Sequence, residues 1–293
     1  MPVDTSNPTK VILTHNTSTA EIYYFGATLT SWKPHGTERL FLSSKAILDG
    51  SKAIRGGIPI VFPHFGTIPS SKLPQHGFAR NSLWKLDGIP SESTTETTVT
   101  LSLSPDSVPP NLRELWPHAF HLAYTVTLTD GELKTALGIT NPSPAAWDFT
   151  TLLHTYLRVG DIAPVRVAGL HGVPFVDKVA AEGEEATAVE GREAVSVARE
   201  VDRVYGPVQN DELVVKGTGV GDGTVFVHKQ NFPDVVVWNP WIEKAKGMAD
   251  FADDEYHNMI CVEVGHVSTP VTLAPGQTWQ GSQTLGARKG AAL

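Results

Sequence analysis

Short runs in which apolar residues alternate with polar ones, separated by turn residues, constrain the fold of this chain most. In residues 99–103 the apolar side chains alternate with Thr and Ser, and in residues 122–128 they alternate with Ala and Thr. Asp130-Gly131 then gives a hairpin signal, and a third alternating run covers residues 133–139. A period of two sends successive side chains to opposite faces of a strand. The runs therefore predict β-strands, with a hairpin between the second and the third.

The rest of the chain repeats this pattern and offers little helical periodicity. Only 111–116 and 243–252 could form a turn or two of helix, whereas the charged, Ala/Glu/Val-rich segment 180–201 is expected to be an exposed insertion with a short edge strand. Closely spaced strands without helices between them are typical of an antiparallel sandwich or barrel. Without a composition shift or a repeat, we expect one β domain over residues 1–293. Further strands are expected near 151–159, 224–229, 234–238, 259–264 and 271–273.

Composition limits the partners and the compartment. The formal net charge of −8 argues against nucleic acid or an anionic membrane as a partner, so an anionic ligand would need a local basic pocket. The N-terminus lacks the apolar run of a signal peptide, and no stretch approaches the roughly 20 apolar residues of a spanning helix. Cys261 is the only cysteine, which excludes an internal disulfide. We therefore expect a soluble, cytoplasmic protein.

Residues 53–80 are unusually rich in Gly and Pro, with four of each, and they contain Arg55 and Arg80. Neither a long helix nor a long strand fits such a stretch, which predicts tight, fixed turns. Rigid loops with a few polar groups often form binding sites, and guanidinium groups suit anions because they donate two hydrogen bonds. A Pro-rich surface crossover with two solvated arginines is the alternative.

Two expected strands carry candidate acid–base residues. Around His154, the apolar side chains share one face, and His154, Tyr156 and Arg158 share the other. Glu263 lies in an apolar strand, on the same face as Cys261. An unpaired buried carboxylate is costly and its pKa rises, which makes Glu263 a candidate general acid or base. A solvated strand face around His154, and a salt-bridged or exposed Glu263, are the alternatives.

Nucleotide and metal motifs are weak. Residues 217–223, G-T-G-V-G-D-G, fail the pattern G-x-G-x-x-G at Asp222 and lack the following Lys of a phosphate loop. Eleven histidines raise the question of a metal site, but no H-x-H pair occurs, and His118 and His121 are three residues apart beside Pro117. We expect neither a cofactor nor a bound metal.

Five motifs span residues from about 53 to 266: G-G-I-P-I-V-F-P-H-F-G, Q-H-G-F-A-R, L-H-T-Y-L-R-V, W-N-P-W and C-V-E-V-G. Together and in this order, they resemble the aldose 1-epimerase (galactose mutarotase-like) family. The more similar branch is that of the glucose-6-phosphate 1-epimerases, or hexose-6-phosphate mutarotases. The resemblance implies a large antiparallel β-sandwich that interconverts the α and β anomers of a hexose 6-phosphate, with glucose 6-phosphate as the first candidate.

The resemblance also implies roles for single residues. It assigns the catalytic acid–base pair to His154 and Glu263. True galactose mutarotases use a second early His, but the residues around His76 differ from theirs, so its role stays open. Phe78 and Trp238 could stack on the sugar or belong to the core. The implied substrate-binding residues are Arg55, Gln75, Arg80 and Asp202, and further candidates for sugar contact are His76, Phe78 and Trp238.

The implied chemistry needs only an acid and a base, because one proton leaves the anomeric hydroxyl while another reaches the ring oxygen. The same reaction on an unphosphorylated aldose and a non-catalytic carbohydrate-binding sandwich are alternatives. The presence of both His154 and Glu263 speaks against the second. A metal-dependent sandwich enzyme is opposed by the missing ligand spacing. We expect a monomer whose partner is a small sugar phosphate.

Overall fold

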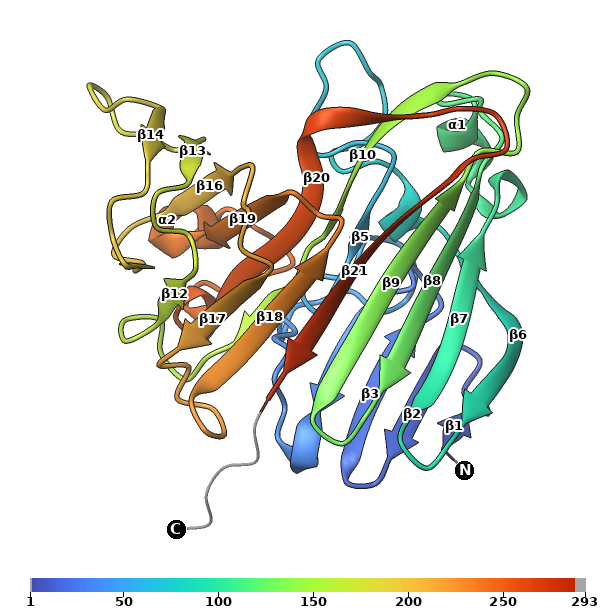
Figure 1. Cartoon of the computed structure of the whole chain (residues 1–293), viewed down its shortest axis with the longest axis horizontal. Helices are drawn as coiled ribbons and strands as arrows, with labels where there is room; N and C mark the ends of the chain where they lie inside the picture. Colours follow the sequence, from blue (N-terminus) through green and yellow to red (C-terminus); the bar gives the residue numbers. More distant parts are fainter. Residues whose placement is uncertain (1, 288–293) are drawn as a thin grey trace.

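The computed structural model describes residues 2–287 and contains three antiparallel sheets (Figure 1). The largest has nine strands, which are, in spatial order, β15 (Ala194–Val195), β12 (Arg166–Ala168), β17 (Glu212–Lys216), β18 (Thr224–Gln230), β21 (Thr278–Gly286), β9 (Glu132–Thr140), β8 (His121–Leu128), β7 (Thr97–Leu103) and β6 (Lys85–Glu92).

The second sheet has eight strands: β14 (Thr187–Val189), β13 (Pro174–Asp177), β16 (Val201–Tyr205), β19 (Asp234–Asn239), β20 (Met259–Leu273), β10 (Trp147–Leu153) and β5 (Ile60–Val61), with β11 (Tyr156–Arg158) paired to β20. The third has four: β1 (Val3–Asp4), β2 (Lys10–His15), β3 (Ser18–Tyr23) and β4 (Leu29–Lys33). The predicted all-β, antiparallel sandwich is confirmed.

All three sheets share one large apolar core. The strands β7 and β8 bury every second residue, as their alternating sequences predict. Side chains of these strands, such as Leu101 and Tyr124, pack in the same cluster as Leu13 of β2 and Val262 of β20. One face of the nine-stranded sheet is therefore covered by the other two sheets.

The centre of the eight-stranded sheet, at β19 and the first half of β20, is buried on both faces. All six residues of β19 are buried, because Val235 and Val237 enter the large core while Val236 and Trp238 enter a second cluster on the opposite face. This second cluster also contains Cys261 and is covered by the segment that follows β19. The segment includes the helix α2 (Trp241–Lys246), which lies beside β16 and β19 in Figure 1.

The Gly/Pro-rich stretch crosses close to other backbone, as its composition predicts. A Cβ on Gly57 would lie 1.9 Å from the carbonyl oxygen of Leu29, and one on Gly77 would lie 2.2 Å from that of Phe62. Both glycines also have positive φ angles, which L-residues rarely adopt. Apart from β5, the regular structure here is a 3₁₀ turn at Ala79–Asn81. Glycine is therefore required where the stretch packs against the sheets.

Helices are few and short. Besides α2 there is α1 (Pro110–Arg113), and 3₁₀ turns cover Pro34–Gly36, Pro105–Ser107 and Glu255–Asn258 as well as Ala79–Asn81. Within residues 2–287, no helix is both long and apolar enough to cross a membrane.

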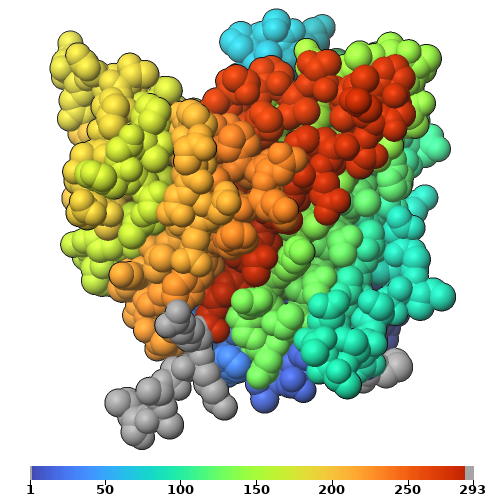
Figure 2. Space-filling model, in the orientation of Figure 1, coloured from blue at the N-terminus to red at the C-terminus, as the bar shows by residue number. Residues whose placement is uncertain are grey.

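Several predicted boundaries were wrong. The strand expected over 151–159 is broken between β10 and β11, because the chain leaves the ladder at His154 and Thr155. The two strands expected near 259–264 and 271–273 are one strand, β20, since its pairing with β10 continues across a bulge. Segment 180–201 carries two short strands, β14 and β15, rather than one, and part of it projects at one side of the molecule (Figure 2, yellow).

Candidate active site

A polar pocket opens on the face of the eight-stranded sheet that turns away from the large core. Its cavity measures about 270 Å³. Eight of the residues singled out from the sequence line it: Arg55, Gln75, His76, Arg80, His154, Asp202, Trp238 and Glu263. These residues span more than 200 positions of the chain, and the fold brings them together.

His154 and Glu263 meet at this pocket. His154 lies in the break between β10 and β11, where its backbone N–H donates to the carbonyl of Pro59 at 2.9 Å. Glu263 lies on β20 and points to the pocket face, as the strand period predicts. The His154 Nδ1 and Glu263 Oε2 atoms are 3.5 Å apart, and their side chains are 9% and 1% exposed.

Burial drives the pKa values of this pair in opposite directions. Burial, with the nearby charges of Arg80 and Arg55, lowers the pKa of His154 well below its usual value. Burial, followed by the charge of Asp202, raises the pKa of Glu263 well above its usual value, although Lys178 and Arg80 act against this shift. Near neutral pH these shifts favour a neutral His154 beside a protonated Glu263, so the pair carries one proton that can move between the two groups. Such a pair can give and take a proton without help from bulk water.

Aromatic rings fix the orientation of His154. The ring of Tyr156 stacks on it at a centroid distance of 4.7 Å and an angle of 12°, and Trp238 meets it edge-on at 5.9 Å. The Tyr156 hydroxyl in turn accepts a hydrogen bond from Arg55 Nη1 at 3.2 Å. Arg55 is also held by Asp250, with 3.2 Å between Nε and Oδ1. The guanidinium group of Arg55 thus contacts Tyr156, whose ring stacks on that of His154.

His76 adds a second imidazole to the pocket wall. Its backbone is in the left-handed region, with φ at 69°, which is uncommon for a residue other than glycine. The Gly66 N–H donates to His76 Nδ1 at 3.2 Å, so a neutral ring carries its proton on Nε2. Burial, together with Arg80, lowers the pKa of His76 well below its usual value, which keeps the ring neutral. Its ring lies 5.7 Å from that of His154.

Arg80 is bound on one side only. Its Nη2 donates to the carbonyl of Gln75 at 2.9 Å, while its Nε is buried without a hydrogen-bond partner among the described residues. Burial lowers the pKa of Arg80 to about 10, so the group is still positively charged at neutral pH. A half-buried cation with unused donors is a suitable partner for an anionic ligand.

Phe78 does not line the pocket, and of its two predicted alternatives, stacking on the sugar or belonging to the core, the structure shows the second. Its side chain is fully buried in the large core, where it packs against Phe62, Trp116 and Phe120. The reason is that Phe78 follows Gly77 in the close crossing over Phe62, and this crossing turns the ring inward. Trp238, the other aromatic candidate, does line the pocket.

His154 and Glu263 also form a group with Cys261 in which the potential ligand atoms lie within 4.8 Å of one another. A His, a carboxylate and a thiolate can ligate transition metals. However, burial raises the pKa of the Cys261 thiol well above its usual value, which opposes the thiolate form that binds metal. The expectation of a metal-independent site stays a prediction, which an assay in EDTA would test.

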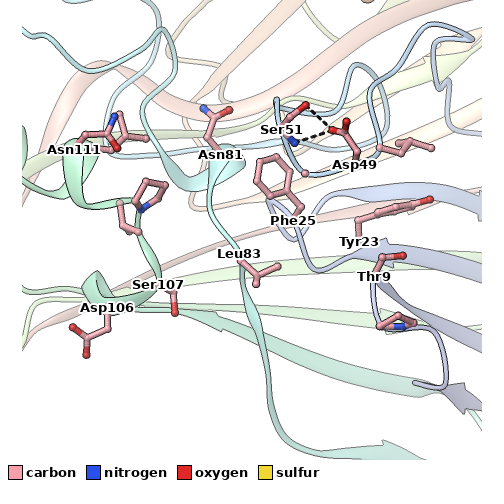
Figure 3. Close-up of a pocket in the computed structure, with 16 residues that line it drawn as sticks. Thr9, Tyr23, Phe25, Asp49, Ser51, Asn81, Leu83, Asp106, Ser107 and Asn111 are labelled. Atoms are coloured by element: carbon pink, nitrogen blue, oxygen red, sulfur yellow. Dashed lines mark hydrogen bonds between the residues drawn. The ribbon is translucent and has the colours of Figure 1, made fainter.

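A larger hollow lies elsewhere on the molecule and has a different chemistry. It measures about 740 Å³ and is lined by Tyr23, Phe25 and Leu83 together with the carboxylates of Asp49 and Asp106 (Figure 3). Among residues 2–287, no His, Lys or Arg lines it. Because it lacks both an acid–base pair and a cation, it suits a phosphorylated substrate less well than the polar pocket does.

Sequence reasoning missed six residues of the polar pocket, namely Phe65, Gly66, Lys178, Val236, Lys244 and Met248. Phe65 and Gly66 lie within a motif that was recognised. Lys178 follows β13 in a region without any motif. It reaches the site only because it lies opposite Asp202 of the neighbouring strand β16. No local signal in the sequence could have identified it.

The fold and site thus define a class: β-sandwich proteins in which a buried His and a carboxyl group meet in a polar, cation-lined pocket. Comparison with known proteins agrees with this class. The family model of the aldose 1-epimerases matches residues 9–286. The chain therefore belongs to the aldose 1-epimerase family, which is a family of enzymes.

Similar proteins are found in plants and bacteria. The chain is 42% identical over 276 residues, which are 92% of it and 81% of the relative, to a protein of Cenchrus ciliaris provisionally named glucose-6-phosphate 1-epimerase. A protein of Escherichia coli K12 with the same provisional name is 34% identical, over 88% of this chain and 83% of its own. The structure matches that of a provisionally named mutarotase from Salmonella typhimurium with a TM-score of 0.83 and 30% identity, covering 98% of this chain and 97% of the other.

Proposed function

We propose that this enzyme interconverts the α and β anomers of a hexose 6-phosphate, with glucose 6-phosphate as the substrate. The observation that carries the proposal is the buried contact of 3.5 Å between His154 and Glu263, in a pocket that is also lined by cations. The provisional names of the relatives at 42% and 34% identity support the choice of a phosphorylated sugar.

In the proposed mechanism, Glu263 removes the proton from the anomeric hydroxyl while His154 gives a proton to the ring oxygen. The bond between C1 and the ring oxygen breaks, and a carbonyl forms at C1. Rotation about the C1–C2 bond presents the other face of this carbonyl, and the former ring oxygen attacks it. His154 then takes back its proton and Glu263 returns its own, so the pair carries one proton at the end as at the start.

The electrostatics of the pocket suit this exchange. The positive charges of Arg80 and Arg55 contribute to the low pKa of His154. A bound phosphate dianion would offset these charges, and His154 would then be protonated more easily. Substrate binding would thereby favour transfer of the Glu263 proton to His154, which gives the base and the acid that ring opening requires. In this proposal Arg55, Gln75, Arg80 and Asp202 bind the sugar phosphate, while the Nε2–H of His76 and the ring of Trp238 contact the sugar.

Exchange between anomers at equilibrium tests the proposal. We would measure saturation transfer between the α and β anomeric protons of glucose 6-phosphate, glucose and galactose by NMR, with and without enzyme. Acceleration should be largest for glucose 6-phosphate. Exchange of glucose 6-phosphate at the buffer rate, or a preference for galactose, would contradict the proposal.

A further inference from the structure

Four cations line the polar pocket, and they differ in how their charges are balanced. Arg55 is held by Asp250, and Lys244 is paired with Glu200 at 3.4 Å. Among residues 2–287, no carboxylate lies within 4 Å of the charged atoms of Arg80 or Lys178. An anionic ligand would therefore meet two positive charges that no carboxylate of the pocket neutralises directly.

Lys178 lines the pocket, where a contact with an aromatic ring holds its ammonium group without neutralising the charge. Its ammonium group lies over the ring of Phe65, 4.0 Å from the centroid. Phe65 packs in turn against His76, at a ring distance of 5.3 Å. The residue is exposed, so the ammonium group keeps access to solvent and binding costs it little desolvation. Its three donors are available to a ligand.

The backbone position of Lys178 is set by the edge of the eight-stranded sheet. Asp177 pairs with Arg203 across β13 and β16, and the Lys178 N–H donates to the carbonyl of Asp202 at 2.8 Å. Lys178 and Asp202 therefore lie opposite each other, and both side chains reach the pocket. Their neighbours Asp177 and Arg203 turn the other way.

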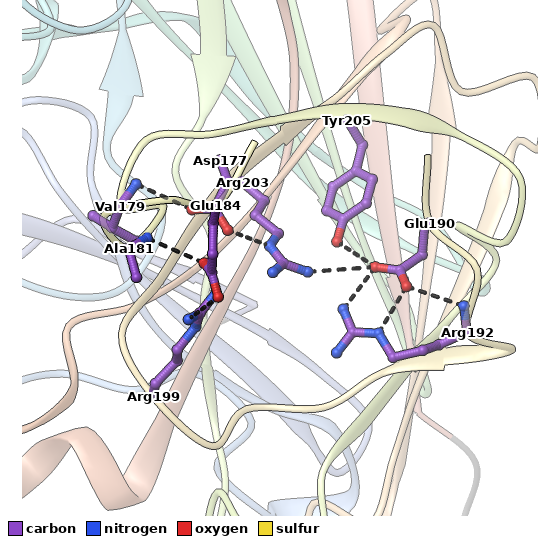
Figure 4. A network of polar contacts seen from close by, with 9 residues as sticks. All are labelled: Asp177, Val179, Ala181, Glu184, Glu190, Arg192, Arg199, Arg203 and Tyr205. Atoms are coloured by element: carbon purple, nitrogen blue, oxygen red, sulfur yellow. Dashed lines mark hydrogen bonds and ion pairs between the residues drawn. The ribbon is translucent and has the colours of Figure 1, made fainter. Parts of the chain in front are cut away.

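These neighbours form a network that fixes the two strands (Figure 4). Arg203 Nε donates to Asp177 Oδ2 at 2.9 Å, and Arg203 Nη1 lies 3.6 Å from Glu190 Oε2. Glu190 also accepts from the hydroxyl of Tyr205 at 2.9 Å and from Arg192 at 2.7 Å. The network holds β13 against β16 from the side opposite the pocket, so that Lys178 is presented at a fixed place.

We infer that Lys178 is a further phosphate-binding residue, which acts with Arg80 to select phosphorylated over unphosphorylated sugars. This inference rests on the proposed function. An ammonium group binds phosphate as a point charge through charge-assisted hydrogen bonds. Because Lys178 is more exposed than Arg80, we expect the smaller effect of such a bond, about a 10-fold loss of affinity on removal.

The test compares Lys178→Met with Lys178→Arg. In anomer exchange, Lys178→Met should raise KM for glucose 6-phosphate about 10-fold with little change in kcat, and should affect exchange of glucose much less. Lys178→Arg should restore most of the affinity. Lys85→Met is the control, because Lys85 is an exposed lysine on β6, at the far edge of the nine-stranded sheet.

Two outcomes would overturn the inference. One is an unchanged KM in Lys178→Met. The other is an equal loss on glucose and glucose 6-phosphate with a displaced pH profile, since Lys178 would then act through the pKa of Glu263. Calorimetric binding of glucitol 6-phosphate, which cannot form a ring, separates this inference from the proposed function. If the wild type binds it but does not catalyse exchange, the function is wrong, and a roughly 10-fold weaker Lys178→Met still supports the role of Lys178.

Discussion

At the scale of single residues, the contact between His154 and Glu263 is costly for the fold. Both side chains are buried, and neither His154 Nδ1 nor Glu263 Oε2 has a hydrogen-bond partner among the described residues. Buried polar groups without partners usually destabilise a protein, and they concentrate at functional sites. The arrangement is therefore understandable as a site built for proton transfer rather than for stability.

Replacing either member of the pair should remove activity without unfolding the protein. Glu263→Gln and His154→Asn should each lower kcat for anomer exchange roughly 10²–10⁴-fold, the usual contribution of general acid–base catalysis. Circular dichroism would confirm that each variant is folded. Exchange at the wild-type rate in either variant would show that the residue does not transfer the proton.

Glu263 should also make stability depend on pH. An unfolded Glu has a pKa of about 4.3, whereas the folded-state pKa of Glu263 is raised well above its usual value. As pH rises above about 4.3, the unfolded state loses this proton first, so the free energy of unfolding falls until the pH passes the folded-state pKa. A neutral amide avoids this loss.

Thermal unfolding of Glu263→Gln and wild type at two pH values would measure the effect. We expect Glu263→Gln to have the higher Tm at pH 8 and a smaller advantage at pH 5, with roughly 2–4 °C for each kcal/mol of stability. His154 is present in both proteins, so its own titration largely cancels in the comparison. A Tm difference that is the same at both pH values would contradict the raised pKa.

At the scale of elements, the strand pair β13–β16 supplies one wall of the pocket, and its order depends on Arg203. Arg203 contacts both Asp177 and Glu190, whose side chains are 6% and 3% exposed. Removing one partner of a buried ion pair leaves an uncompensated charge behind. Arg203→Met should therefore loosen β13 against β16 and displace Lys178 and Asp202.

Hydrogen exchange would detect this loosening. Amides of β13 and β16 should exchange faster in Arg203→Met, while those of β8 and β9 should not change, and KM for glucose 6-phosphate should rise. Arg199→Met is the matched control, because Arg199 pairs with Glu184 in the same region but both side chains are 46% exposed. An exposed pair contributes only about 0–1 kcal/mol, so its loss should have little effect. Equal effects of the two variants would refute the role of the network.

The elements also show how far the sequence alone determines the structure. Period-two alternation predicted β7, β8 and β9 well, because each buries one face only. The break at His154 was not predicted, since Leu153 and Leu157 keep the alternation while the intervening backbone bonds to Pro59 and Gly57 of another segment. Such a break depends on tertiary contacts, which a local pattern does not contain.

The candidate site, like the strands, was predictable only where the sequence carries a local pattern. Motifs with several special residues pointed to Arg55, His154 and Glu263, all of which line the pocket. Lys178 carried no signal, because a single lysine after a short edge strand resembles any solvated residue. The sequence left two alternatives for Phe78, because an aromatic residue beside a binding motif can face the core or the ligand, and only the close crossing at Gly77 decides which.

At the scale of the whole molecule, the enzyme must bind an anion against its own net charge of −8. Positive charge concentrated in one cleft can overcome such a field at short range. The polar pocket combines Arg55, Arg80, Lys178 and Lys244. Within residues 2–287, Arg80 and Lys178 are the two of these without a carboxylate partner, and Arg80 is the less exposed of the two. Arg80 should therefore contribute most to the preference for phosphorylated sugars.

Arg80→Met should weaken the binding of glucose 6-phosphate about 10- to 150-fold, which corresponds to roughly 1.5–3 kcal/mol for a hydrogen bond to a charged group. Because the phosphate lies away from the reacting carbon, most of the loss should appear in KM. Arg55→Met is the informative comparison, since Asp250 already balances the charge of Arg55 and its bond to Tyr156 supports His154. Its loss should affect glucose and glucose 6-phosphate more equally. If Arg80→Met lowers activity on both sugars by the same factor, the pocket does not select its substrate by the phosphate.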